Sequence, residues 1–418
     1  MSNGKERRRV VITGMGLVTP LATGVQASWR ALCEGKSGVG LITRFDASEF
    51  RTQIAAEVKD FQAADFLTRK QARIKDLYVQ YSLAAAQMAM DDAGLTLNSD
   101  NACRAGVLVG NCLGGINTLA AEMDVMKSEG PLRVSPYLIP NILPNMAAGD
   151  VAQRFGAKGP NRCVSTACAS GNHSLGDAFK LVQHGEADIM IAGGVEAGIV
   201  PVIIAGVDNL GAASRRNSDP EGAMRPFERD RDGFVTGEGC GVMVLEELES
   251  ALRRGAKNIY AEVAGYGSTD DAYHWTSPQP SAETSTQCIR LALEDAGLTP
   301  SDIDLVNAHG TSTVLNDVAE TRAIKLAFGE HSGKLPVTAN KSMIGHCFGA
   351  AGAIEGVFTV LSIRTGTIPP TINYQNPDPE CDLDYVPNRA RKANIKAAIS
   401  NSFGFGGTNA VVAFKAFQ

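Results

Sequence analysis

The sequence predicts an α/β protein built from two similar halves. Strand-like and helix-like patterns alternate along the chain, as is typical of sheets covered by helices. Residues 92–96 read Asp-Ala-Gly-Leu-Thr, and the same five residues recur at 295–299. A second pair of related segments lies at 11–16 and 262–267, in the same order. Two matches in one order predict that a single α/β unit occurs twice.

Composition narrows the class of protein. The chain has 418 residues, 44% hydrophobic and 20% charged, which is typical of an ordinary globular protein with a sizeable core. A net charge of −6 argues against general nucleic-acid binding. The nine cysteines are scattered and form no C-x-x-C pair, so neither a disulfide framework nor a zinc site is expected.

The N-terminus carries no targeting signal that the sequence reveals. Residues 1–9 are polar and basic and lead directly into a strand pattern, without the apolar segment of a signal peptide. The chain contains no run of about 18 apolar residues that would predict a membrane span. We therefore expect the mature protein to be the whole chain, in the reducing cytoplasm.

The first elements form a strand, a helix and a second strand. Residues 10–16 have the pattern of a buried strand, and Thr19 stands where a dinucleotide-binding fingerprint needs a glycine, so that interpretation is weak. Residues 80–93 form an alanine-rich helical pattern that Gly94 is expected to end. The apolar run 106–110 predicts the next strand.

The strongest local signal surrounds Cys168. A β-compatible run ends at this cysteine, and a helical pattern follows at Leu175, Ala178, Phe179 and Val182. A thiol at a helix N-terminus is expected to favour the thiolate, and small neighbours would let a substrate carbonyl approach. The sequence thus predicts a nucleophile. The alternative is an inert core cysteine, which is a common position for this residue.

A glycine-rich, polar stretch covers residues 193–241 and contains the charged run 225–234. Such a run predicts a solvated loop, with a surface loop near a site or a subunit contact as the alternative. A helix is expected at 246–255. We expect the first half to span residues 1–260 and carry the nucleophile, and the second half to span 261–418 and carry both candidate histidines. Because no low-complexity linker separates them, the halves should pack as one body.

Two of the six histidines lie in settings that favour function. His309 follows the predicted strand at 305–306, where ligand groups gather in open α/β sheets. His346 lies in a glycine-flanked turn before a helix, which indicates close backbone approach. For any single histidine a structural role is the commoner explanation, but two such turns together with Cys168 favour a shared site. Such a setting is missing from the other four: His173, His184, His274 and His331.

Two further features point to the same site. The predicted helix 350–363 is apolar nearly all round, so Glu355 would be buried and Lys341 is the expected counter-charge. Alternatively, Glu355 reaches solvent at a helix edge. The turn at 401–409 places Phe405 between glycines, where backbone conformations open to glycine could aim an N–H group at an oxyanion.

At these motifs the chain resembles the elongating β-ketoacyl-[acyl-carrier-protein] synthases, and most closely the synthase II group. Thr166-Ala167-Cys168, Asn307-Ala308-His309-Gly310-Thr311, Lys341 to His346 and the phenylalanine-glycine turn occur together and in order. The resemblance runs nearly end to end. It implies the thiolase fold, with five layers αβαβα built from two similar halves, and a homodimer.

The resemblance also implies a reaction in fatty acid biosynthesis. Cys168 would take the acyl group from an acyl-carrier-protein thioester, and malonyl-carrier protein would then lose CO₂ and attack that acyl group, so the chain grows by two carbons. His309 and His346 would stabilise the enolate, and the backbone N–H groups of Cys168 and Phe405 would form the other oxyanion hole. Neither a cofactor nor a metal is expected, because the substrates arrive on the phosphopantetheine of acyl carrier protein.

Supporting roles follow from the same resemblance. Lys341 and Glu355 would orient the site, Phe405 would gate it, and the bulk of Leu113 would affect chain length in the acyl pocket. The phosphopantetheine arm would be bound by Thr311, Thr313 and, less surely, Ser277. Acyl carrier protein, an acidic partner, would dock on the basic cluster of Arg69, Lys70, Arg73 and Lys75.

Three stretches depart from the family pattern and keep alternatives open. Residues 313–318 lack the usual proline, glycine and lysine, Cys347 and Phe348 replace smaller or aliphatic residues, and 211–214 differ from the common loop. One alternative is therefore a ketosynthase of a specialised polyketide or aryl-polyene pathway. Another is a non-catalytic chain-length partner, against which the presence of Cys168 speaks.

Overall fold

The computed structural model describes residues 7–418 of the protein. A mixed sheet of ten strands runs through it. The first part of the chain contributes five strands: β1 (Val10–Val18), β4 (Ala105–Gly110), β5 (Asn161–Val164), β6 (Ile189–Glu196) and β7 (Gly239–Glu247). The second part contributes five more: β8 (Ala261–Asp270), β9 (Leu305–Asn307), β10 (Val337–Thr338), β13 (Ala397–Phe403) and β14 (Thr408–Lys415). Their order in the sheet is β10-β9-β13-β14-β8-β1-β7-β6-β4-β5.

The two halves of this sheet have the same topology. From the middle outwards, the first reads β1-β7-β6-β4-β5 and the second β8-β14-β13-β9-β10. In each half the two pairings nearest the middle of the sheet are antiparallel, and the two towards the outer edge are parallel. β1 and β8 pair antiparallel and join the halves. The duplication predicted from the internal repeat is confirmed.

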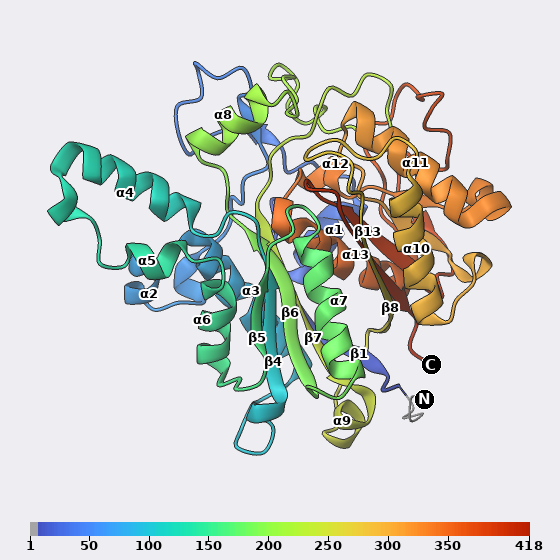
Figure 1. Cartoon of the computed structure of the whole chain (residues 1–418), viewed down its shortest axis with the longest axis horizontal. Coiled ribbons are helices and arrows are strands. Elements are labelled where there is room, and N and C mark those ends of the chain that lie inside the picture. The colour runs from blue at the N-terminus through green and yellow to red at the C-terminus, as the bar shows by residue number, and fades with distance from the viewer. Residues whose placement is uncertain (1–6) are drawn as a thin grey trace.

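Helices divide the protein into five layers (Figure 1). α3 (Leu77–Ala93) and α6 (Met146–Phe155) cover the outer face of the first half, and α10 (Glu283–Ala296) and α11 (Val314–Phe328) cover the second. α7 (Ser170–Gln183) and α13 (Ala351–Thr365) contact each other and strands of both halves. Because these two helices lie between the half-sheets, the arrangement is αβαβα, as expected. The prediction of a buried helix near 350–363 is confirmed by α13.

The repeated glycines explain how the outer helices lie so close to their strands. A Cβ atom on Gly14 of β1 would stand 2.1 Å from the carbonyl oxygen of Ala89 in α3. In the second half, a Cβ atom on Gly265 of β8 would stand 2.3 Å from the carbonyl oxygen of Ala292 in α10. Only glycine fits such an approach, so both copies keep it.

The repeated aspartates make equivalent hydrogen bonds. A side-chain oxygen of Asp92 accepts the backbone N–H of Met15 at 3.0 Å. Its counterpart Asp295 accepts the backbone N–H of Tyr266, also at 3.0 Å. Each aspartate therefore ties the end of an outer helix to the strand beneath it. The following glycine Gly94 has φ 56° and ends α3 as expected.

One expected helix begins later than its pattern indicates. Residues 246–255 were expected to be helical, but α9 spans Leu248–Arg253. Glu246 and Glu247 instead complete β7, where they pair with Val11 and Val10 of β1. Tertiary pairing outweighs helix propensity at these two positions. The expected boundary between residues 260 and 261 lies at the start of β8 and stays a prediction. Residues 1–6 of the first half lie outside the described residues.

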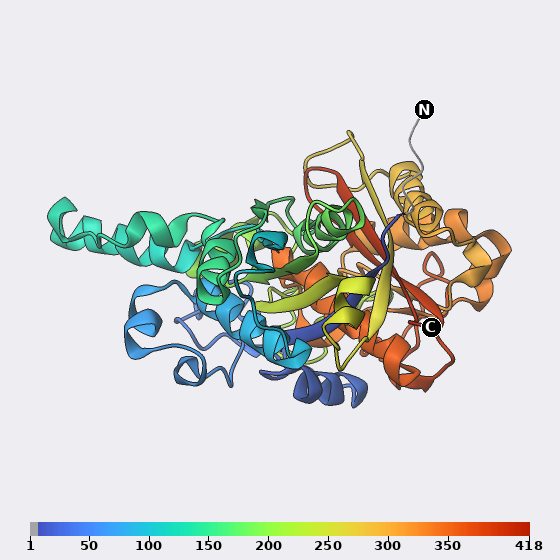
Figure 2. The same ribbon diagram turned by 90° about the horizontal axis from the view of Figure 1, so that it is seen from below.

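An arm of two helices extends from the first half (Figures 1 and 2). It consists of α4 (Ile116–Glu129) and α5 (Leu138–Ile142). The remaining named helices are α1 (Val25–Cys33), α2 (Arg69–Ile74), α8 (Pro201–Asn209) and α12 (Lys341–Ile344). Two short strand pairs complete the fold: β2 (Gly40–Leu41) with β3 (Ile54–Ala55), and β11 (Thr367–Ile368) with β12 (Arg391–Lys392).

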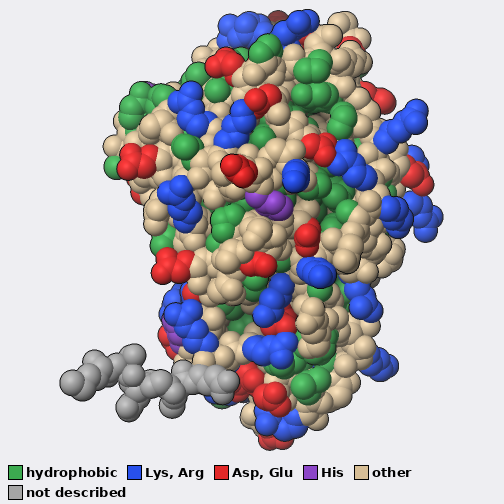
Figure 3. Space-filling model, turned by 90° about the vertical axis from the view of Figure 1, so that its right-hand side faces the viewer, with side chains coloured by type: hydrophobic (Ala, Val, Ile, Leu, Met, Phe, Trp, Pro, Cys, Tyr) green, Lys and Arg blue, Asp and Glu red, His purple; other side chains and the backbone are tan. Residues whose placement is uncertain are grey.

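The surface shows neither a membrane-spanning helix in the described residues nor a face of one charge in Figure 3. Within residues 7–418, no helix combines the length and apolar character needed to cross a bilayer. The face on the right-hand side of Figure 1, over α10 and α11, shows basic and acidic side chains interspersed with apolar ones (Figure 3). This face therefore resembles an ordinary solvated surface.

Candidate active site

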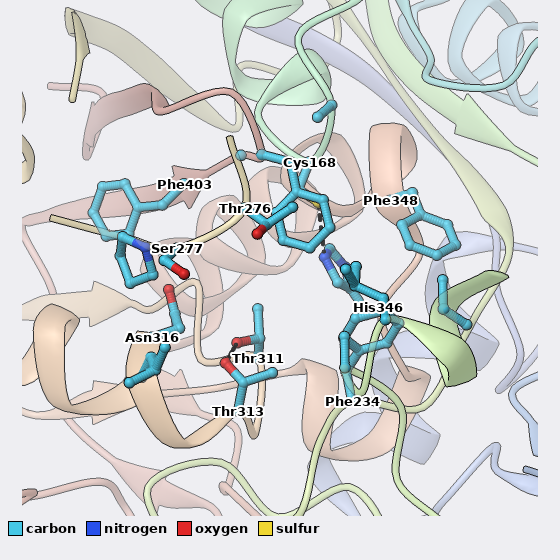
Figure 4. A pocket seen from close by; sticks show the side chains of 18 of the residues that line it. Cys168, Phe234, Thr276, Ser277, Thr311, Thr313, Asn316, His346, Phe348 and Phe403 are labelled. Carbon is cyan, nitrogen blue, oxygen red and sulfur yellow. Dashed lines mark hydrogen bonds between the residues drawn. The ribbon is translucent and has the colours of Figure 1, made fainter. Parts of the chain in front are cut away.

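A cavity of about 610 Å³ brings residues of both halves together (Figure 4). It is lined mainly by apolar atoms, and aromatic rings from Phe234, Phe348 and Phe403 border it. Eight residues that the sequence singled out line it: Leu113, Cys168, Ser277, His309, Thr311, Thr313, His346 and Phe405. The structure therefore gathers the predicted nucleophile, both candidate histidines and the candidate substrate-binding residues around one space.

Cys168 lies in a tight turn directly before α7. Ala167 adopts φ 49°, and the N–H of Ser170 donates to the carbonyl oxygen of Ala167 at 3.1 Å. The Ser170 hydroxyl accepts the N–H of Thr166 at 2.8 Å and so closes the turn. A Cβ atom on Gly404 of the opposing hairpin would stand 2.7 Å from the carbonyl oxygen of Thr166. The glycine at 404 thus allows the two turns to pack closely.

Burial outweighs the helix end in its effect on the ionisation of Cys168. Burial raises the pKa of Cys168 to about 11, although the Lys341 ammonium and the backbone N–H of Phe405 both lower it. The expectation that the helix end would favour the thiolate is therefore wrong at neutral pH. The reason is desolvation: a charged sulfur in this apolar cavity loses more hydration than the N–H groups return.

Alkylation should reveal this neutral thiol. With iodoacetamide, we expect the modification rate of Cys168 to rise about tenfold per pH unit from about pH 7 to pH 9, because only the thiolate reacts. Peptide mapping by mass spectrometry measures it, with the exposed Cys103 as an internal reference. A rate for Cys168 that levels off below pH 8 would contradict the neutral thiol.

The two histidines lie side by side at the cavity wall. Their ring centroids are 5.4 Å apart, and each side chain is almost fully buried. His346 Nε2 stands 3.1 Å from the Cys168 sulfur. Burial, together with the Lys341 charge, holds the pKa of both imidazoles well below the usual value. Both rings are therefore neutral, and each can present one N–H group to a ligand.

Lys341 and Glu355 form the expected ion pair behind the histidines. Lys341 Nζ lies 2.6 Å from Glu355 Oε1, and both side chains are completely buried. Burial raises the pKa of Glu355, and the Lys341 ammonium opposes that shift. The alternative, in which Glu355 reaches solvent, is wrong.

The same lysine sets the tautomer of His309. Lys341 Nζ stands 3.3 Å from His309 Nδ1. An ammonium group has only donors, so Nδ1 must accept, and the ring proton of His309 is then on Nε2.

Sequence reasoning missed the carboxylate that holds His309. Glu320 in α11 accepts the backbone N–H groups of His309 at 2.8 Å and Gly310 at 2.7 Å. Its first oxygen also accepts Asn401 Nδ2 at 3.1 Å. Glu320 is buried and joins the histidine turn to β13. No element was predicted for residues 314–328, which form α11, so no sequence signal pointed to this carboxylate.

Three charged residues of the run 225–234 are buried, namely Arg225, Glu228 and Arg231, so the prediction of a solvated loop holds only for the exposed Arg229, Asp230 and Asp232. Arg231 is 5% exposed, donates to the carbonyl oxygens of Thr313 and Val314, both at 3.1 Å, and pairs with Asp378 at 2.5 Å. Its charge is tolerated because these partners satisfy it. The alternative of a segment near the site is the correct one, since it supports the residues that follow His309.

The turn that carries Phe405 is shorter than expected. Residues Asn401 to Phe403 belong to β13, and the hairpin turn comprises 404–407, where Gly406 and Gly407 have φ of 89° and 86°. Phe405 is 39% exposed. The N–H of Gly406 donates to the carbonyl oxygen of Trp275 at 2.7 Å, which joins this turn to the segment containing Ser277.

The mouth of the cavity carries the hydroxyl groups that the sequence singled out. Thr311 Oγ1 and Thr313 Oγ1 lie 2.8 Å apart, and Ser277 faces the same space (Figure 4). Among the described residues, no cluster of three or more His, Cys, Asp or Glu side chains is placed to hold a metal ion.

The basic cluster lies apart from the cavity, on and just after α2. Arg69, Lys70 and Arg73 are exposed. Lys75 is 18% exposed and pairs with Asp150 at 2.5 Å. The structure therefore presents three of the four basic side chains to solvent, and the fourth is already neutralised.

The known proteins that are similar in sequence to this chain are β-ketoacyl synthases. The family profile described as beta-ketoacyl synthase, N-terminal domain, matches residues 7–251, and the corresponding C-terminal domain profile matches residues 260–375. The 3-oxoacyl-[acyl-carrier-protein] synthase 2 of Synechocystis sp. is 51% identical, over 99% of each chain.

Two solved structures are similar in fold and sequence. One is the ishigamide ketosynthase/chain length factor, with a TM-score of 0.92 and 39% identity over 99% of this chain and all of that chain. The other is a type II polyketide ketosynthase bound to its acyl-carrier protein, with a TM-score of 0.89 and 38% identity over the same shares.

Proposed function

The chain belongs to the β-ketoacyl synthase family, and on that basis we propose that it elongates acyl chains in fatty acid biosynthesis. The reaction is a decarboxylating condensation of an acyl-carrier-protein thioester with malonyl-carrier protein, and the chain gains two carbons. The observation that carries this proposal is a buried cysteine next to two neutral histidines in one apolar cavity. The 51% identical relative carries a matching name.

The first stage is acyl transfer to Cys168. The cysteine sulfur forms a bond to the thioester carbon, the carrier-protein sulfur departs, and the thiol proton ends on that departing sulfur. The backbone N–H groups of Cys168 and Phe405 stabilise the charge that develops on the carbonyl oxygen. Covalent transfer leaves the acyl group in the cavity while the carrier proteins exchange.

The second stage forms the new carbon–carbon bond. Malonyl-carrier protein loses CO₂, and its thioester carbonyl oxygen gains negative charge as the enolate develops. His309 donates its Nε2–H and His346 donates its ring N–H to that oxygen, and the low pKa of both rings keeps them neutral donors. The enolate carbon forms a bond to the acyl carbon, and the Cys168 sulfur leaves as a thiolate. A proton from solvent then restores the neutral thiol.

The supporting residues act through these groups. Lys341 keeps the proton of His309 on Nε2, and Glu355 balances the lysine charge. Thr311, Thr313 and Ser277 line the mouth, where their hydroxyls bind the polar phosphopantetheine arm. Phe405 gates the cavity between the two stages, and its partial exposure on a glycine-flanked turn supports that role.

Acyl carrier protein docks on the cationic side chains Arg69, Lys70 and Arg73. The Arg69→Glu/Lys70→Glu variant is expected to raise KM for acyl-carrier protein about tenfold at low salt and to change kcat little, because attraction of an acidic partner mainly affects association. Added salt should shrink the difference. Steady-state kinetics at two ionic strengths measure both effects.

A matched charge reversal provides the control for docking. Arg253 and Lys257 are also exposed and lie in and after α9, far along the chain from α2. The Arg253→Glu/Lys257→Glu variant should keep the wild-type KM. Equal KM changes in both double variants would mean that net charge, and not the α2 cluster, governs binding.

The protein forms a homodimer through the first half. Apolar side chains are exposed along the α4–α5 arm, including Met126, Leu132 and Ile139. β5 ends the sheet, with Asn161 and Arg162 exposed, so its outer edge is free to pair with a second copy. Light scattering should give twice the chain mass, and a monomer at micromolar concentration would refute this assembly.

The proposal also covers the cellular location of the protein and the division of its catalytic residues between the two halves of the chain. A cytoplasmic location is supported by the nine cysteines, all of which are free thiols. The catalytic groups divide between the halves 1–260 and 261–418, with Cys168 in the first and both histidines in the second.

The deciding experiment is turnover on a panel of acyl groups. Purified protein with malonyl-carrier protein should extend saturated acyl-carrier proteins, and mass spectrometry of the carrier protein measures the two-carbon increment. The similar structure of a type II polyketide ketosynthase favours a second candidate, a specialised ketosynthase that accepts other acyl groups. Turnover of polyketide-like or polyene acyl groups without any saturated chain would replace the first function by the second.

A further inference from the structure

A buried carboxylate that sequence reasoning overlooked joins two loops of the site. Glu196 is the last residue of β6 and is completely buried. Its Oε2 accepts the backbone N–H groups of Cys112 at 2.9 Å and Gly349 at 3.1 Å, and its Oε1 accepts that of Leu113 at 3.1 Å. One side chain therefore satisfies three backbone donors from segments more than two hundred residues apart in sequence.

Both loops carry residues that face the cavity. Cys112 and Leu113 line it in the first loop, and Phe348, next to Gly349, lines it in the second. The loops also touch directly, because a Cβ atom on Gly349 would stand 2.6 Å from the Cα atom of Asn111. Glu196 thus holds the first loop against the turn that follows His346. Burial raises the pKa of Glu196 to about 7, and the three N–H groups oppose that shift.

Gly198 makes room for the side chain that Glu196 positions. Gly198 lies two residues after Glu196, and a Cβ atom there would stand 2.6 Å from Leu113 Cδ1. A real Cβ atom at that distance would push the leucine away. Since Gly198 does not have a positive φ, alanine fits its backbone and the effect of substitution falls on Leu113. Glu196 therefore fixes the backbone of Leu113, and Gly198 leaves space for its side chain.

Resting on the function proposed above, we propose that Glu196 is a positioning residue and Gly198 a specificity-determining residue, which together set the acyl chain length by fixing Leu113. Leu113 shares an apolar cavity with the Cys168 sulfur, so an acyl chain on that sulfur extends along the leucine. Displacing the leucine into the cavity shortens the space for the chain. Releasing its backbone lets the leucine occupy several positions, and discrimination between chain lengths weakens.

The test measures how fast Cys168 takes up acyl groups of two lengths. Intact-mass spectrometry gives the acylation rate constants with hexanoyl- and dodecanoyl-carrier protein, without any need for condensation. In Gly198→Ala the ratio of dodecanoyl to hexanoyl rate should fall about tenfold, the size expected when a pocket loses room for a methylene or more. Gly198→Ala/Leu113→Ala should recover the ratio of Leu113→Ala alone, because the added Cβ no longer meets a Cδ1 atom.

A conservative variant tests the carboxylate. In Glu196→Gln one oxygen acceptor becomes a donor that faces backbone N–H groups, so at least one loop is released. The ratio of the dodecanoyl to the hexanoyl acylation rate should change about fivefold or more, in the direction of equal rates. A change of this size is expected when a pocket discriminates less well between chains of different length. Glu246→Gln is the matched control: Glu246 is a buried carboxylate of the neighbouring strand β7, bonded to Thr13 and Arg254, and its variant should keep the wild-type ratio.

The outcomes separate the inference from the proposed function. An unchanged ratio in Gly198→Ala, or an equal change in Glu246→Gln and Glu196→Gln, would overturn the inference. If Glu196→Gln does not fold, the Gly198→Ala and Leu113→Ala variants decide the matter. Wild-type protein that acylates Cys168 but never condenses would refute the proposed function, and the acylation ratios would still judge the inference.

Discussion

Cys168→Ala is expected to abolish acyl-enzyme formation and to lower the condensation rate by about 10⁴-fold or more. Two thiols line the cavity, and Cys168 is the one beside the histidines, with its sulfur 3.1 Å from His346 Nε2. Burial and the Glu196 charge hold the pKa of Cys112 well above its usual value, and the histidines act as neutral donors. Without Cys168 the reaction would need direct attack between two carrier-bound thioesters, which loses the advantage of a covalent intermediate. Intact-mass spectrometry after incubation with acyl-carrier protein measures the adduct.

The control for this substitution is a cysteine of the surface. Cys103 is exposed and distant from the cavity lining, so Cys103→Ala should form the acyl-enzyme at the wild-type rate. Thermal melting of both variants shows whether the fold is retained. Undiminished acyl labelling of Cys168→Ala would remove Cys168 from the role of nucleophile, and peptide mapping would then identify the labelled residue.

His309→Ala should separate the two stages of the reaction. We expect acylation of Cys168 to stay within a fewfold of wild type, because His346, and not His309, contacts the sulfur. Condensation should fall about 10² to 10³-fold, the effect of removing one donor from a developing oxyanion. His346→Ala should lower condensation similarly and also disturb acylation. Rapid mixing of preloaded acyl-enzyme with malonyl-carrier protein, followed by CO₂ release, measures the second stage alone.

A surface histidine provides the comparison. His184 is exposed at the end of α7, so His184→Ala should leave both stages unchanged. If His309→Ala slowed acylation as much as condensation, the ring would act at Cys168 and not at the malonyl carbonyl. The neutral state of His309 also predicts that the rate of the second stage shows no fall due to imidazole protonation above about pH 6, given a pKa held well below its usual value.

The charge state of Cys168 and the burial of Arg231 were both predicted wrongly, because each depends on groups that are distant in sequence. The helix start at Cys168 was correctly predicted, yet the conclusion that it favours the thiolate was wrong. A helix end is visible in a local pattern, whereas desolvation depends on everything packed around the sulfur. The same holds for Arg231: its charged neighbourhood suggested solvent, but distant acceptors at Thr313, Val314 and Asp378 allow it to be buried.

The sequence by itself determined the duplication, the strands and helices around the motifs, and the pairing of Lys341 with Glu355. These features depend on periodicity, on glycines where backbones must approach closely, and on the cost of an unpaired buried charge, all of which short segments record. Only the tertiary structure decided which groups meet: that Glu320 holds the turn of His309, that Glu196 joins two loops, and that the Cys168 thiol stays neutral. Those outcomes depend on contacts between residues far apart in the sequence and on the exclusion of water from the folded interior. A short segment of sequence predicts neither of these.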